Sequence, residues 1–140
     1  MATTVANTST AAGLTVLNTE LSGYPTNSFG IRFNNTALMD TVWLGPGTLI
    51  KDHLRGITKS TGAGGVANLT AVGIHIDGIT GSCVYLDAPT SSTIGTWLFD
   101  GCWFGGVPST WCDYGIIATE NGGAVVGLQL TGCYLTNMDT

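Results

Sequence analysis

Charged side chains are scarce in this 140-residue chain: they make up 9% of it, against roughly 25% in an ordinary globular domain. Nine acids and four bases give a formal net charge of −5. Nucleic acid and anionic membranes do not attract such a surface, so we expect neither as a partner. No apolar run is long enough to form a membrane-spanning helix. The N-terminus lacks the features of a signal peptide, which predicts synthesis in the cytoplasm without a secretion signal.

Metal-site spacings are also missing. The four cysteines and two histidines form no CxxC or HxxxH pattern, so we expect no metal and no cofactor. These residues are Cys83, Cys102, Cys112, Cys133, His53 and His75. Cysteine in a strand pattern is a common small apolar filler, which favours free thiols over disulfides.

Helical periodicity is nearly absent. No stretch keeps apolar residues at helical spacing for three turns, and the best candidate, residues 51–55, is one turn at most. The chain has 21 Gly, yet its 44% hydrophobic content is enough to form a core. We therefore expect an all-β fold, with residues 1–12 as a flexible arm and residues 13–140 as a single domain.

A repeated phrase indicates how the strands are organised. Residues 97–104 (WLFDGCWF) and 128–135 (LQLTGCYL) share an apolar alternation, a Gly-Cys hinge and an aromatic residue. Aligned copies begin at residues 13, 30, 73, 96 and 127, and the interval from 73 to 96 predicts the length of one turn. This pattern predicts a β-solenoid of about five to six short rungs. A β-sandwich or jelly roll is the rival fold.

The segments 73–76 (GIHI) and 97–105 (WLFDGCWFG) resemble rungs of the right-handed parallel β-helix of pectate lyases, polygalacturonases and bacteriophage tail spikes. The resemblance covers residues 70–135 well and residues 13–60 loosely. It implies a right-handed parallel β-helix, association into homotrimers as in tail spikes, and either receptor binding or polysaccharide cleavage. The scarcity of charge departs from the catalytic members, which collect carboxylates and arginine on one face.

Two aromatic residues after the Gly-Cys hinges are the main binding candidates. In the alignment Trp103 and Tyr134 point outward one rung apart, so we expect them to be neighbours on an outer face. Exposed aromatics beside short polar groups suit sugar rings. An inserted loop at residues 105–114 or a neighbouring subunit would also cover them. The outward ladder is predicted to read Thr15, Arg32, His75, Leu98 and Gln129, and Arg32 is a further candidate glycan contact.

The candidate catalytic residues are two carboxylates and a histidine. Asp77 and Asp100 occupy the same position in the alignment, so stacking would raise one pKa and create an acid and base pair, with His75 as a neighbouring base. Both aspartates precede Gly, which is also the usual sequence of a tight turn. The pattern leaves catalysis open and favours turn formation.

The only basic cluster lies between residues 51 and 59. It consists of Lys51, His53, Arg55 and Lys59. Such a cluster could meet an acidic sugar, although a solvated loop is the more ordinary interpretation.

These features favour a structural and receptor-binding β-helix module of a phage tail spike or similar appendage, located on a virion or outside a cell and contacting surface glycans. The alternative is a lyase or glycoside hydrolase that degrades polysaccharide. An ice-binding solenoid would need the same outward residue in every turn, which the predicted ladder lacks.

Overall fold

The protein is built from strands alone in the part of the chain that its computed structural model describes: residues 3–5, 13–24, 26–61, 64–90, 92–106 and 112–138. The predicted all-β class is confirmed. No helix in these ranges is long and apolar enough to cross a membrane.

The strands form three sheets of five strands each. Sheet A contains β1 (Thr3–Val5), β4 (Phe29–Asn34), β7 (Arg55–Thr61), β10 (Ser82–Pro89) and β13 (Tyr114–Asn121). Sheet B contains β2 (Leu14–Val16), β5 (Met39–Leu44), β8 (Val66–Val72), β11 (Thr93–Asp100) and β14 (Ala124–Thr131). Sheet C contains β3 (Glu20–Ser22), β6 (Leu49–Lys51), β9 (His75–Asp77), β12 (Trp103–Gly105) and β15 (Tyr134–Thr136).

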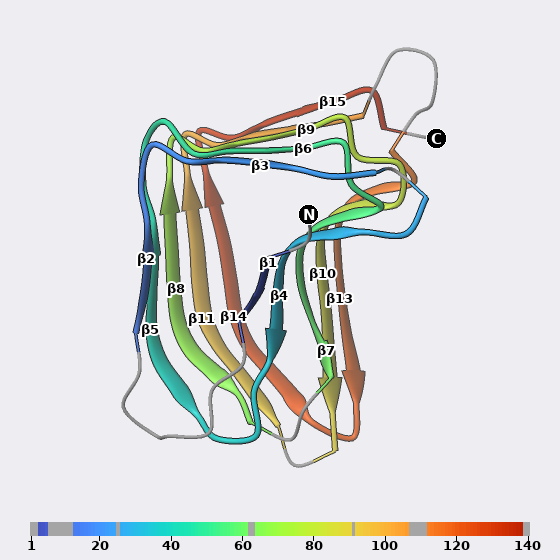
Figure 1. Ribbon diagram of the computed structural model, residues 1–140. Coiled ribbons are helices and arrows are strands. Elements are labelled where there is room, and N and C mark those ends of the chain that lie inside the picture. Colours follow the sequence, from blue (N-terminus) through green and yellow to red (C-terminus); the bar gives the residue numbers. More distant parts are fainter. Residues whose placement is uncertain are drawn as a thin grey trace.

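Every neighbour in a sheet comes from the next turn of the chain, and all named strand pairs are parallel. In Figure 1 the strands of sheet B rise on one side, those of sheet C cross at one end, and those of sheet A descend opposite. The chain is a right-handed parallel β-helix of about four turns. The predicted solenoid is therefore confirmed, and the rival sandwich of antiparallel hairpins is excluded.

The turns are longer than the interval from 73 to 96 suggested, although the copies that begin at residues 96 and 127 do lie one turn apart. In sheet B, Leu14 pairs with Val42, Val42 with Leu69, Leu69 with Trp97 and Trp97 with Leu128. Every one of these intervals exceeds the interval from 73 to 96, so the predicted turn length is wrong. Longer turns also explain why the chain makes about four turns rather than five to six.

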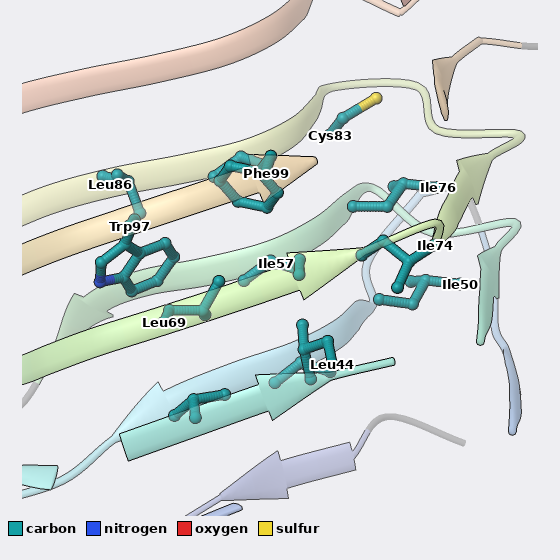
Figure 2. Close-up of a cluster of buried hydrophobic side chains, with 14 of the residues drawn as sticks. Leu44, Ile50, Ile57, Leu69, Ile74, Ile76, Cys83, Leu86, Trp97 and Phe99 are labelled. Carbon is teal, nitrogen blue, oxygen red and sulfur yellow. The ribbon is translucent and has the colours of Figure 1, made fainter. Parts of the chain in front are cut away.

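The interior is a stack of apolar side chains contributed by all three sheets. Strands alternate inward and outward residues, so equivalent inward positions meet their counterparts one rung away. Figure 2 shows Trp97 and Leu69 from sheet B, Ile76 from sheet C and Ile57 from sheet A pointing into this interior. The Trp97 ring meets the edge of Phe33 at a centroid distance of 5.9 Å and an interplanar angle of 77°, a favourable aromatic geometry.

A glycine in the left-handed region marks the corner between sheets B and C. Gly73, Gly101 and Gly132 each have φ of +58°, and no atom lies within 4 Å of where their Cβ would be. The hinge predicted at Gly101 and Gly132 is therefore present. Gly73 is its equivalent one rung earlier, although the sequence alignment treated it as the start of a copy. Because the alignment began this copy at Gly73, it matched the residues of the copy to the wrong residues of the later copies.

The cysteines after two of these hinges tie successive rungs together. The Cys102 thiol donates to the carbonyl of Ala71, and the Cys133 thiol donates to the carbonyl of Phe99, both at 3.4 Å. Burial raises the pKa of Cys102 to about 11, so its thiol keeps the proton that it donates. All four cysteines are free.

Three other segments were singled out in the sequence. Within the predicted N-terminal arm, residues 3–5 form strand β1, which pairs with β4, and the rest of the arm lies outside the described residues. Residues 51–55, the best helical candidate in the sequence, are not helical, because β6 ends and β7 begins there with a bend between them. Residues 107–111 of the predicted loop insertion are outside the described residues.

The hinge conformation can be tested with two alanine substitutions. Gly101→Ala is expected to lower the free energy of unfolding by about 1–2 kcal/mol, because an L-residue in the left-handed region is strained. Gly127→Ala is the matched control, since its Cβ would only touch Thr96 at ordinary contact distance, 3.7 Å. Urea unfolding of both variants measures the difference. Equal losses would contradict the assignment of strain to the hinge.

Candidate functional site

A ladder of rings runs along the outer face of sheet C. Along β9 and β12 the residues alternate, so His75 and Trp103 are exposed while Ile76 and Phe104 are buried in the core. Strand β12 pairs with β9 on one side and β15 on the other, which places Trp103 beside both His75 and Tyr134. The prediction that Trp103 and Tyr134 are neighbours on an outer face is confirmed.

The three rings are stacked. Ring centroids lie 6.1 Å apart between His75 and Trp103 and 5.7 Å apart between Trp103 and Tyr134, with interplanar angles of 18° and 23°. Trp103 is 37% exposed and Tyr134 is 65% exposed, since Tyr134 lies on the last strand of the sheet. Stacking restricts the orientations of the three rings, and a side chain that is already ordered loses less entropy if it binds a ligand.

Gly105 lies beside this ladder, two residues after Trp103 on β12, and it is buried. A Cβ at Gly105 would lie 3.1 Å from Thr136 Oγ1, 3.1 Å from Trp103 Nε1 and 3.2 Å from Asp77 Oδ1, which is closer than ordinary van der Waals contact. A hydroxyl, an indole N–H and a carboxylate therefore pack closely around this glycine, and a larger residue would crowd them.

Next to Gly105 the surface has a hollow of about 350 Å³, which we call the Gly105 notch. This volume is at the small end of the range for ligand pockets. Its lining consists of His75, Asp77, Trp103, Gly106, Thr136 and Asn137. Stacked rings and convergent polar groups thus share one cavity.

Local hydrogen bonds fix the walls of the notch. The backbone N–H of Gly78 donates to Asp77 Oδ1 at 2.9 Å, and Gly78 has φ of +66°. The prediction that Asp77 forms a tight turn is confirmed. On the opposite side, the Asn137 amide donates to the carbonyl of Gly106 at 3.1 Å. The carboxylate is therefore held in a defined position while it faces the notch.

The two aspartates proposed as a catalytic pair are on different sheets. Asp100 ends β11 in sheet B, between Val72 and Thr131. Asp77 ends β9 in sheet C and pairs with Lys51. The expected stacking of the two carboxylates is wrong, because the copies that aligned them were displaced by the hinge glycine.

The residues of the predicted outward ladder lie on three different sheets, for the same reason. Thr15, Leu98 and Gln129 belong to sheet B, as expected, with Leu98 paired directly to Gln129. His75 lies on sheet C instead. Arg32 lies on sheet A over the ring of Phe29, 5.0 Å from its centroid, so it does not join Trp103 and Tyr134.

The prediction that the basic cluster forms a solvated loop is also wrong. Lys51 forms an ion pair with Glu20 at 2.8 Å across neighbouring strands. His53 and Lys59 are completely buried. Burial lowers the pKa of Lys59 to about 8, because desolvation disfavours the ammonium form. Alternation along β7 turns Lys59 away from solvent, which a charge-based interpretation of the sequence could not detect.

His53 bridges two turns of the chain near β3. Its Nε2 lies 3.1 Å from the carbonyl of Leu21 and its Nδ1 lies 2.8 Å from Ser28 Oγ. A carbonyl only accepts, so Nε2 carries the proton. Burial is the main cause that lowers the pKa of His53. The ring is therefore a neutral structural link.

Sequence reasoning found the rings and Asp77 but missed three residues of the cavity. Gly106, Thr136 and Asn137 are polar or small residues at or just after strand ends, where no motif distinguishes them. The available signal was register: Thr136 follows Tyr134 along β15 at the same distance as Gly105 follows Trp103 along β12.

Comparison of the chain with models of protein families, with curated proteins and with solved structures gave no significant match. The fold and the cavity therefore carry the functional inference by themselves.

The buried histidine predicts a pH dependence. Because the pKa of His53 is lowered by folding, the unfolded chain binds more protons below its ordinary value of 6.5. The free energy of unfolding should therefore decrease as the pH falls from about 7 through 6.5.

Urea unfolding across this range provides the measurement. His53→Gln should flatten the slope between about pH 7 and 5.5, a window in which few other side chains titrate. His75→Gln, at the exposed second histidine, is the control and should retain the slope. An unchanged slope in the His53 variant would refute the explanation.

Proposed function

We propose that this chain is a binding module of a phage tail spike or similar surface appendage, and that it contacts glycans through the outer face of sheet C. The observation that carries the proposal is the Trp103 and Tyr134 stack beside the Gly105 notch. Aromatic rings contact the C–H faces of sugars, while hydroxyl, carboxylate and N–H groups bond their hydroxyls.

The solenoid suits an extended glycan. Strands in a sheet lie about 4.8 Å apart, so an outward ladder presents side chains at regular intervals along the solenoid axis. Leu49, His75, Trp103 and Tyr134 occupy one such ladder on β6, β9, β12 and β15. A rigid ladder of this kind favours recognition of a repeating polymer over a single compact molecule. A location on a virion or outside a cell, where glycans are displayed, follows from the same proposal.

The contents of the cavity favour binding over cleavage. Glycoside hydrolysis by the common mechanism needs two carboxylates that flank the scissile bond. Among the described residues that line the cavity, Asp77 is the one carboxylate, with His75 beside it. We therefore propose that the face retains glycans rather than degrading them.

Replacement of Trp103 tests the binding face. Trp103→Ala should reduce glycan binding at least about tenfold, since loss of a central aromatic contact commonly costs more than about 1 kcal/mol. Trp43→Ala is a closely matched control, because Trp43 is also an outward tryptophan on a strand and is 38% exposed against 37% for Trp103. Binding to a glycan array and titration calorimetry of the strongest hit provide the measurement. Equal losses in both variants would contradict the proposed site.

We also propose that the chain associates into a homotrimer. Ten large hydrophobic side chains are exposed in the described part of the chain, and extensive apolar exposure is typical of association surfaces. They are Leu17, Tyr24, Leu38, Trp43, Trp103, Tyr114, Val126, Leu130, Tyr134 and Leu135. Packing of a neighbouring subunit on Trp103 and Tyr134 is the competing explanation for their exposure.

Light scattering after gel filtration tests the trimer. It also distinguishes glycan binding from subunit packing at Trp103 and Tyr134. The wild-type chain should have three times the mass of one chain, and Trp103→Ala should keep that mass while it loses glycan binding. A monomer at all concentrations would refute the trimer. If the Trp103 variant dissociates, the ladder is a subunit interface instead of a glycan-binding face.

A further inference from the structure

None of the four cations of the chain lines the Gly105 notch. Lys51 pairs with Glu20 at 2.8 Å, and the Arg55 guanidinium lies 3.7 Å from the centroid of the Tyr85 ring. Lys59 is buried in the core, and Arg32 lies on sheet A. An anionic ligand at the notch would therefore meet no lysine or arginine among the described lining residues.

The ionised group at the notch is instead a carboxylate. Asp77 Oδ1 accepts one hydrogen bond, from the Gly78 N–H, and a carboxylate has about four acceptor positions. Its register partner on β6, Lys51, is already paired with Glu20 on β3, so these two charges compensate each other. The N–H of Asp52, a further acidic residue, donates to the carbonyl of Asp77 at 3.1 Å. The net charge of −5 adds a weak long-range repulsion of anions.

We infer that the notch selects its sugar by charge: a pyranose with an amino group binds best, a neutral one binds next, and one with a carboxylate is rejected. This inference rests on the proposed glycan-binding face and specifies its ligand class. An ammonium group beside Asp77 gains a charge-assisted hydrogen bond, whereas a uronic acid gains only repulsion and loses part of its hydration. The basic cluster in the sequence left an acidic sugar open as an alternative, and the burial and pairing of those cations argue against it.

A matched series of sugars tests the order. The probes are the β-1,4-linked tetramers of glucosamine, glucose and glucuronic acid, which share one backbone and differ in charge. Titration calorimetry of the full chain at low and high salt should rank them in that order. Neighbouring members should differ by about twofold to fivefold at low salt, the range of an exposed charge pair. Salt should compress the differences.

Two variants test whether Asp77 causes this order of affinities. Asp77→Asn should bring the three affinities to within about twofold of one another, since it removes the charge and keeps the shape. Asp100→Asn is the matched control: it removes the same charge from another exposed aspartate that also precedes a glycine, but on sheet B. The control should preserve the full order.

The outcomes separate the two proposals. Binding of the glucuronate tetramer as tightly as the glucose tetramer, or an order that survives Asp77→Asn, overturns the charge selection and leaves glycan binding intact. Absence of binding to all three tetramers overturns the glycan-binding face and the selection with it.

Discussion

The parallel register between successive turns is the constraint on which the rest of this structure depends. Each of the three sheets satisfies its backbone groups by pairing with the turn before and the turn after. Because the side-chain period of a strand is two, this pairing also decides which residues enter the core and which form outward ladders. A shift of one residue would send Trp103 inward and Phe104 into solvent.

The corners of the solenoid must allow this register to persist. Gly101 turns the chain with φ of +58°, which an L-residue adopts only with strain. Cys102 then satisfies the carbonyl of Ala71, one rung away, with a thiol small enough for the corner. The Gly-Cys pair thus has a structural purpose in its own right. The aromatic residue that follows it points outward as a consequence.

The candidate site combines stacked rings with a hollow beside them. The rings of Trp103 and Tyr134 form a wall, and the hollow next to it is lined by Asp77, Thr136 and Asn137 among others. The charged side chains are also unevenly placed. The cations are buried or paired, whereas a carboxylate lines the notch. In a chain with so few charges, the placement of one aspartate can determine the preferred ligand.

The sequence alone determined the all-β class, the hinge at Gly101 and Gly132, and the adjacency of Trp103 and Tyr134. These follow from local alternation and from two copies that lie one turn apart, so short-range patterns were sufficient. The tertiary structure alone decided the register of the earlier turns, the separation of Asp77 from Asp100, the burial of Lys59 and the groups that surround Gly105. Turn length varies along the solenoid, since the last turn of sheet B is longer than the turns before it, and glycine occurs at more than one kind of position. Only the hydrogen-bonded pairing of strands can therefore establish which residues share a ladder.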